Sequence, residues 1–387
     1  MTEPLSIIYF LVMKIEHGGD IWGASQETGQ RPGDLVDFSS SINPEGPAPA
    51  AREAIMELID NERLLAAYPD PCSKALHKAL GSYLGIKEES ILAGNGSTQF
   101  IYLIPEVLRP GRALIVEPAF SEYAPALARA GSEVIPFLLK EDEDFAIDPR
   151  RLKKALLEQR PQILYIANPS NPVGRLREKE NLLKIAGFCR EKNIRLLIDE
   201  AFIDFNEDHS MAEEASQQDH IIVLRSMTKF FGLAALRLGY MVGARGLVET
   251  FRHALATWSI NSAAAVAGVA SLGDSSYISR TRKWLKREGP LMREGLMDIA
   301  GLKVYDSAAN FFTVRLTSGA GYAGNDNEPM TAPRLKDLLL RKGLLIRDLS
   351  NIRGLGEDFF RVALKNPVEN RLLLRELKAI LGGGDGI

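Results

Sequence analysis

The sequence predicts an α/β protein in which a large domain, with a mostly parallel sheet flanked by helices, is joined to a smaller α+β domain. Apolar runs of strand length alternate with amphipathic stretches of helical length along most of the chain. The 387 residues, 45% of them hydrophobic, are enough to bury the cores of two domains. We expect residues 48–274 to form the large domain, and residues 1–47 and 275–387 to form the small domain.

Apolar runs bounded by turn residues mark the expected strands, because buried parallel strands carry apolar residues on both faces. In the large domain these runs are residues 113–118, 161–167, 194–202, 221–227 and 238–244, and the helices between them include residues 151–160 and 178–192. In the small domain the expected strands lie within residues 304–316, 344–349 and 359–365, and the expected helices are residues 277–299 and 367–381.

Charge and cysteine content exclude several classes of protein. A formal net charge of -3 provides no basic field for nucleic acid, so the attraction of an anionic substrate must be local. Cys72 and Cys189 are far apart and have neither metal-ligand nor redox spacing, so we expect two reduced thiols and no metal site. The apolar run at residues 6–13 is too short to span a bilayer. These features predict a cytoplasmic protein with no nucleic-acid or membrane partner.

Lys229 is the first candidate for a catalytic residue. It lies just beyond the apolar run of residues 220–225 and is followed by Phe230 and Phe231. Apolar surroundings disfavour a charged ammonium, and Arg237 places a second cation nearby, so we expect a neutral amine that can form a Schiff base with an aldehyde. A lysine that snorkels from a strand end is the alternative interpretation.

Two polar side chains follow other strands of the predicted sheet. Asp199 precedes Lys229 by a strand, a connection and a second strand, so both side chains can reach one crevice at the strand ends. A carboxylate there could hold a pyridine nitrogen protonated, whereas a helix N-cap or a surface ion pair is the alternative. Asn171 lies in a turn fixed by two Asn-Pro steps, where its amide could donate to a phenolate-type oxygen. An ordinary loop explains the prolines equally well.

A glycine turn opens a predicted helix within residues 91–104. Gly94 and Gly96 allow close backbone approach, and free N–H groups at the start of the helix form an anion site. Ser97 and Thr98 supply these groups together with Gly96. Because the match to a dinucleotide-binding GxGxxG pattern is only partial, a plain turn remains the alternative.

Together these segments resemble the fold-type I, aspartate aminotransferase-like enzymes that use pyridoxal 5'-phosphate. The order of glycine turn, aromatic residue, Asn-Pro loop, Asp, Lys and Arg is that of the family, and the resemblance runs from His17 to about Leu381. It implies the fold-type I architecture, a covalent bond between Lys229 and the cofactor, and a homodimer with shared active sites. The further cofactor contacts that it implies are Asp199 at the pyridine nitrogen, Asn171 at the ring hydroxyl, Phe120 stacked on the ring, Gly96, Ser97, Thr98, Ser226 and Arg237 at the phosphate, and Tyr68 reaching the phosphate from the neighbouring subunit.

One position departs from the pattern of this family. Many of its aminotransferases carry a tyrosine three residues after the aspartate, bonded to the ring hydroxyl of the cofactor, where this chain has Phe202. The loss of that donor should alter the acidity of the lysine–cofactor linkage. Ordinary transamination is therefore a less secure expectation for this chain.

Motifs near both ends of the chain resemble a narrower group, the threonine-phosphate decarboxylases, which are cobalamin-pathway relatives of histidinol-phosphate aminotransferases. The motifs include HGGDIWGAS from His17, LVDFSSSINPEGP from Leu35, and LLIRDLSNIRGLG from Leu344. In that group the N-terminal segment folds over the active site. The resemblance implies substrate contacts by His17, Ser41 and Asn43, by Arg347 to a phosphate and by Arg361 to an α-carboxylate; for Arg347, an ion pair with neighbouring Asp348 is the alternative.

The reaction that this resemblance implies is the decarboxylation of L-threonine O-3-phosphate to (R)-1-amino-2-propanol O-2-phosphate in cobalamin biosynthesis. Two anchored anionic groups could hold the C–COO bond perpendicular to the cofactor ring, where its electrons enter the conjugated system. If the α-proton faced Lys229 instead, transamination would follow. Histidinol-phosphate aminotransferase, or a related class I/II aminotransferase, is therefore the alternative. A non-catalytic nucleotide-binding protein is a more distant alternative that leaves Lys229 unexplained.

Overall fold

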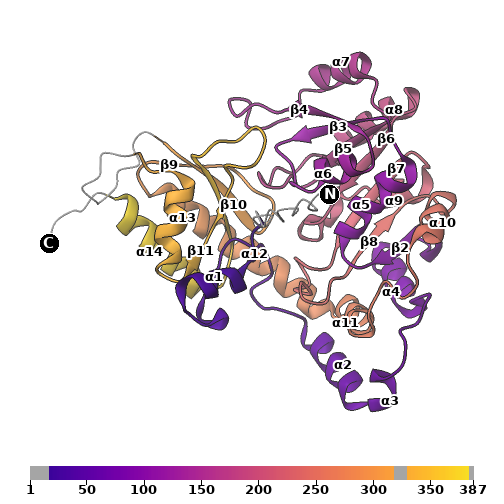
Figure 1. Ribbon diagram of the computed structural model, residues 1–387, viewed down its shortest axis with the longest axis horizontal. Coiled ribbons are helices and arrows are strands. Elements are labelled where there is room, and N and C mark those ends of the chain that lie inside the picture. The colour runs from indigo at the N-terminus through magenta and orange to yellow at the C-terminus, as the bar shows by residue number, and fades with distance from the viewer. Residues whose placement is uncertain (1–16, 318–328, 383–387) are drawn as a thin grey trace, which may run out of the picture.

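The computed structural model describes residues 17–317 and 329–382, which are arranged around two main sheets (Figure 1). The larger sheet has seven strands and the smaller has four. This arrangement confirms the predicted α/β class with a large, mostly parallel sheet, whereas the domain boundaries stay a prediction. The apolar run at residues 6–13 lies outside the described residues. Within the described ranges, no helix combines the length and the apolar character needed to cross a membrane.

The seven-stranded sheet contains every strand predicted for the large domain. Its order is β2-β8-β7-β6-β5-β3-β4, and β8 is antiparallel to both of its neighbours. The apolar run predicted to continue to Phe202 ends as a strand at Asp199, because the chain turns there. The strands are β2 (Ile91–Gly94), β3 (Arg112–Glu117), β4 (Glu133–Leu138), β5 (Ile163–Ala167), β6 (Arg195–Asp199), β7 (Ile221–Ser226) and β8 (Gly239–Val242).

Helices cover both faces of this sheet, which explains the continuous apolar runs of its strands. In β5, Ile163 and Tyr165 face one cluster of buried side chains, whereas Leu164 and Ile166 face the other. The first cluster includes side chains of α5, α6 and α10, and the second includes those of α7, α8 and α9. The helices of this region are α2 (Pro49–Asp60), α3 (Glu62–Leu65), α4 (Lys74–Leu84), α5 (Ser97–Leu108), α6 (Tyr123–Arg129), α7 (Pro149–Gln159), α8 (Lys179–Glu191), α9 (Ala212–Gln217), α10 (Arg245–Ala254) and α11 (Ser262–Gly273).

The four-stranded sheet is antiparallel, with the order β12-β13-β10-β9. The segment predicted as one strand at residues 344–349 is divided, since its first part, β11, pairs with β1 near the N-terminus and its second part, β12, pairs with β13. The elements of this region are α1 (Ile21–Thr28), β1 (Val36–Asp37), α12 (Ser275–Met297), β9 (Leu302–Val304), β10 (Phe311–Leu316), α13 (Ala332–Leu340), β11 (Leu344–Leu345), β12 (Arg347–Asp348), β13 (Phe359–Ala363) and α14 (Pro367–Leu381).

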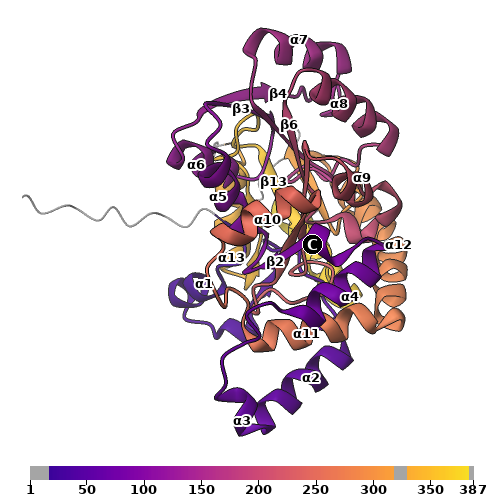
Figure 2. The same ribbon diagram turned by 90° about the vertical axis from the view of Figure 1, so that its right-hand side faces the viewer.

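The two sheets lie on either side of a space at the carboxyl ends of the central parallel strands (Figure 1). Helix α12 runs between the two regions and contacts β9 and α14. Figure 2 shows α7 and α8 together at one end of the molecule and α2 and α3 at the opposite end. The fold thus leaves the carboxyl ends of β5, β6 and β7 facing the small sheet.

Candidate active site

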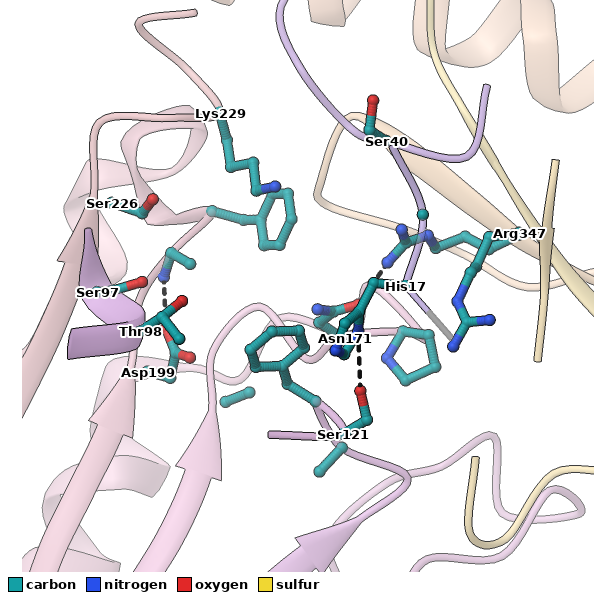
Figure 3. Close-up of a pocket in the computed structure, with 18 of the residues that line it drawn as sticks. His17, Ser40, Ser97, Thr98, Ser121, Asn171, Asp199, Ser226, Lys229 and Arg347 are labelled. Carbon is teal, nitrogen blue, oxygen red and sulfur yellow. Dashed lines mark hydrogen bonds between the residues drawn. The ribbon is translucent and has the colours of Figure 1, made fainter. Parts of the chain in front are cut away.

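A cavity of about 220 Å³ lies at the carboxyl ends of β5, β6 and β7 (Figure 3). In the sheet register Ala167 pairs with Asp199, and Asp199 pairs with Leu224, so these three strands end at the same edge. The small sheet contributes side chains from β12 and β13 to the opposite wall. The cavity brings together eleven of the residues predicted from the sequence: His17, Ser97, Thr98, Phe120, Asn171, Asp199, Ser226, Lys229, Arg237, Arg347 and Arg361.

Lys229 follows β7 by three residues and contributes the only amine among the described residues that line this cavity. Burial, followed by the positive charges of Arg361 and Arg237, lowers the pKa of its ammonium to about 8. Its Nζ atom lies 6.0 Å from the centre of the Phe202 ring. An amine with this pKa is partly neutral at physiological pH, as a nucleophile toward an aldehyde must be.

Asp199 is held at the end of β6 by two hydrogen bonds. The Tyr123 hydroxyl donates to Oδ2 at 2.5 Å, and the backbone N–H of Ala201 donates to Oδ1 at 3.0 Å. Burial raises the pKa of this carboxyl, and the bond from Tyr123 opposes that rise. No cation of the described chain segments forms an ion pair with this buried carboxylate, which is therefore suited to a protonated ring nitrogen.

Tyr123 is a site residue that the sequence did not reveal. It is the first residue of α6 and is fully buried, and 76 residues separate it from Asp199 in the chain. The only local signal is its place three residues after Phe120, in the same EPAFSEY segment. Its pairing with Asp199 depends on how the fold places α6 over the strand ends.

An anion site lies at the start of α5. The helix begins at Ser97 without a side-chain cap, so the N–H groups of its first turn are oriented for a ligand. A side chain at Gly96, where φ is 79°, would place Cβ 2.9 Å from Nη2 of Arg237, so glycine allows the guanidinium to pack against the turn. Ser226 also lines the cavity, and its hydroxyl lies 2.8 Å from that of Thr228.

Two arginines from the small sheet face each other across the β12–β13 pair. Arg347 is in register with Arg361, an arrangement that is unfavourable for like charges unless an anion lies between them. Arg361 donates to Oδ1 of Asn171 at 2.5 Å and to the Ser39 carbonyl at 2.9 Å, and burial lowers its pKa to about 10. Arg347 donates to Oδ1 of Asn351 at 2.8 Å. Both arginines line the cavity, and Figure 3 shows Arg347 across it from Lys229.

His17 lies at the mouth of the cavity, above the ring of Phe120. Its Nε2 atom is 2.6 Å from Oε1 of Glu122, and its Nδ1 atom is 3.3 Å from the Ser121 hydroxyl. The two ring centres of His17 and Phe120 are 5.9 Å apart. Glu122 also accepts a hydrogen bond from the Tyr102 hydroxyl, so it fixes the imidazole to the body of the large region.

Besides Gly96, three predicted residues lie outside the lining of this cavity. The side-chain amide of Asn43 is buried and donates to Tyr277, Thr281 and the Phe230 carbonyl, so the structure gives it a packing role in place of substrate contact. Ser41 is also buried, whereas its neighbours Ser39 and Ser40 line the cavity. Tyr68 is 79% exposed and stacks on Trp258. Its predicted contact from a neighbouring subunit is not tested within one chain.

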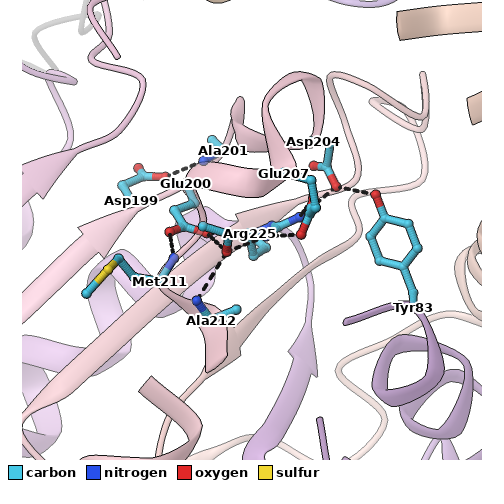
Figure 4. Close-up of polar contacts among 10 residues, drawn as sticks. Tyr83, Asp199, Glu200, Ala201, Asp204, Glu207, Met211, Ala212 and Arg225 are labelled. Carbon is cyan, nitrogen blue, oxygen red and sulfur yellow. Dashed lines mark hydrogen bonds and ion pairs between the residues drawn. The ribbon is translucent and has the colours of Figure 1, made fainter. Parts of the chain in front are cut away.

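A cluster of buried ion pairs lies beside the carboxyl ends of β6 and β7 (Figure 4). Arg225 in β7 is fully buried and contacts Asp204 at 2.8 Å, Glu207 at 2.8 Å and Glu200 at 3.2 Å. Tyr83 donates a further hydrogen bond to Asp204. Because Glu200 follows Asp199 and Arg225 precedes Ser226, this cluster fixes the backbone beside two residues of the cavity.

The side chains of the cavity fit the functional groups of pyridoxal 5'-phosphate. Lys229 suits the aldehyde, and the buried carboxylate of Asp199 suits the ring nitrogen. The Asn171 oxygen is occupied by Arg361, which leaves the NH2 group as the donor for a ring hydroxyl. The uncapped start of α5, with Arg237 beside it, suits the phosphate.

Comparisons with known proteins include the following related matches. Residues 33–377 match the model of the aminotransferase class I and II family. The chain is 36% identical over 372 residues to a threonine-phosphate decarboxylase of Salmonella typhimurium, a match that covers 95% of this chain and 97% of the relative. The crystal structure of the histidinol-phosphate aminotransferase from Clostridium acetobutylicum is similar with a TM-score of 0.79 and 31% identity, covering 89% of this chain and 98% of that one.

Proposed function

Since the chain belongs to the aminotransferase class I and II family, we propose that it is a pyridoxal 5'-phosphate-dependent decarboxylase of L-threonine O-3-phosphate. The product is (R)-1-amino-2-propanol O-2-phosphate, and the pathway is cobalamin biosynthesis. The observation that carries the proposal is the pair of facing arginines, Arg347 and Arg361, opposite Lys229 in one cavity. A substrate with both a phosphate and a carboxylate provides an anion for each guanidinium.

The roles of the cavity residues follow from their positions and charges. Bound pyridoxal 5'-phosphate supplies an electron-poor ring that accepts the electrons of the bond broken at the α-carbon. Asp199 keeps the ring nitrogen protonated, because its buried carboxylate is stabilised by a cation. Lys229 would hold the cofactor through its aldehyde. Its Nζ atom can then hold the proton that replaces carbon dioxide on the α-carbon.

The two arginines orient the substrate. A guanidinium presents a planar set of donors that pairs two oxygens at once, so Arg361 can fix the carboxylate plane while Arg347 fixes the phosphate. Hydrogen bonds to Asn171 and Ser39 hold Arg361 in place. His17, held by Glu122, covers the mouth of the cavity beside Phe120 and is placed to contact the substrate phosphate.

Transamination is the alternative reaction. The similarity to a histidinol-phosphate aminotransferase, with 31% sequence identity, supports this alternative. The purified holoenzyme should therefore be incubated with L-threonine O-3-phosphate, with and without 2-oxoglutarate. We expect release of carbon dioxide and of the aminopropanol phosphate at a rate independent of 2-oxoglutarate. Formation of a keto acid that requires 2-oxoglutarate, without carbon dioxide, would instead establish the aminotransferase.

Replacing Arg347 by alanine tests the phosphate anchor. We expect kcat/KM for L-threonine O-3-phosphate to fall by about 10- to 100-fold, since a charged hydrogen bond to the phosphate contributes roughly 1.5–3 kcal/mol. Turnover of L-threonine, which lacks the phosphate, should change much less. Arg341→Ala, on the C-cap of α13 and outside the cavity, is the matched control. Equal losses for both substrates would remove Arg347 from this role.

The enzyme is further proposed to be a cytoplasmic homodimer whose subunits share active sites. The exposed side chains of Met56, Ile59, Leu64 and Leu65 form an apolar surface on α2 and α3, beside Tyr68. A second copy of the chain would cover this surface and bring Tyr68 to the cofactor phosphate of its neighbour. Sedimentation of the holoenzyme at twice the mass of the 42.6 kDa chain is the expected result.

A further inference from the structure

A second cavity, of about 630 Å³, lies between α7, α8 and the segment of residues 306–308. It shares no lining residue with the first cavity. Helices α7 and α8, which line it, lie at the end of the molecule opposite α2 and α3 (Figures 1 and 2). Its walls are mainly apolar, with Leu152 and Leu156 from α7 and Leu182, Ile185 and Phe188 from α8. Neither the family resemblance nor the proposed reaction gives this cavity a role.

Arg177 is a buried charge in the wall of this cavity. It is 9% exposed, and its backbone N–H donates to Oδ1 of Asn168 at 2.7 Å. Of its guanidinium nitrogens, Nη1 donates to the Ala167 carbonyl at 2.8 Å, and Nε is buried without an acceptor. Burial, followed by the positive charge of Arg175, lowers its pKa to about 10. Within the described ranges, the guanidinium therefore has a carbonyl contact but no ion pair.

The other charges around the cavity leave an excess of positive charge. Four basic residues line it, and the two acidic residues, Glu178 and Asp306, each contact a basic side chain outside the lining. Of the other basic residues, Arg175 is paired with Asp144, and Lys153 lies 5.4 Å from the centre of the Phe188 ring. Lys153 and Lys184 also lack an ion pair among the described residues, but both are exposed to solvent. Arg177 is thus the buried cation of this lining that has no compensating charge, which is costly.

We propose that the second cavity binds an organic monocarboxylate with an apolar body, whose carboxylate pairs with Arg177. A single guanidinium neutralises one negative charge, and an aliphatic chain matches the leucine-rich walls better than a hydrated phosphate does. The headgroup would contact the 168–177 turn, which also holds Asn171 in the first cavity. This site is independent of the proposed reaction, and its occupant is a ligand and not a substrate.

Titration calorimetry of the holoenzyme with sodium octanoate tests this site without relying on catalysis. We expect one octanoate bound per chain, and at least about tenfold weaker binding by Arg177→Met, because that change removes a charged hydrogen bond and keeps the apolar length. Arg175→Met, which removes a basic residue already paired with Asp144, is the matched control and should bind as the wild type does. The uncharged octanamide should bind at least about tenfold more weakly than octanoate.

A second variant keeps the test decisive if Arg177→Met fails to fold. Ile185 is only partly buried in the wall, so Ile185→Trp should project a larger side chain into the cavity and weaken octanoate binding while leaving Arg177 in place. No octanoate binding by the wild type would overturn the proposal. Binding that survives both Arg177→Met and Ile185→Trp, or that is lost equally in Arg175→Met, would also overturn it.

Discussion

Replacing Lys229 by alanine is expected to reduce turnover of L-threonine O-3-phosphate by at least about 10³-fold and to leave the fold intact. The amine would both hold the cofactor aldehyde and donate the proton to the α-carbon, so one substitution removes two functions. Folding should tolerate the change, because burial and two neighbouring arginines disfavour the lysine charge in the native state. Carbon dioxide release and circular dichroism measure the two parts of this prediction.

The control for this experiment is a lysine with similar exposure but no contact with the cavity. Lys179 is 27% exposed and pairs with Glu214 at 2.8 Å, so Lys179→Ala should retain turnover. Borohydride reduction followed by peptide mass spectrometry should place the cofactor on Lys229 in the wild type and on no lysine in Lys229→Ala. Retained activity in Lys229→Ala, or a cofactor attached elsewhere, would contradict the assigned chemistry.

The main features of the fold follow from local sequence, because strands buried on both faces must be apolar throughout. This is why β5, β6 and β7 were predicted, and why β4 was not. β4 is an edge strand with Pro136 inside it and only Phe137 buried, so it presents no continuous apolar run. Its place in the sheet depends on pairing with β3, a contact that the sequence of residues 133–138 does not specify.

A site residue could be predicted from the sequence where its residue type is unusual in its local sequence environment. A lysine set among apolar residues and an aspartate ending a buried strand each point to chemistry by themselves. The Tyr123–Asp199 bond was not predictable, because it joins segments brought together only by the fold. Ser41 and Asn43 belong to a motif that reaches the cavity, but the local turn directs Ser39 and Ser40 into it. A motif identifies a segment, whereas backbone geometry selects the side chain.

Replacing Arg225 by methionine should destabilise the protein by about 3–5 kcal/mol, since Glu200 and Asp204 would remain buried without their cation. Urea unfolding of the variant and the wild type measures this difference. Arg280→Met is the matched control, because Arg280 is 48% exposed and lies 3.8 Å from Glu45, so its loss should cost less than about 1 kcal/mol. Adding Glu200→Gln to the Arg225 variant should restore part of the stability.

The pH dependence of the unfolding free energy tests whether the buried carboxylates cause the lower stability of the Arg225 variant. Burial raises the pKa of Glu200 from 4.5 to about 7, even though the charge of Arg225 opposes the rise. Between these values the folded chain binds a proton that the unfolded chain has lost, so this group contributes less stability as the pH rises. Without Arg225 the folded pKa is higher still, and the loss continues above pH 7. The stability gap between wild type and variant should therefore widen from about pH 6 to about pH 9, and a constant gap would show that the buried carboxylates are not its cause.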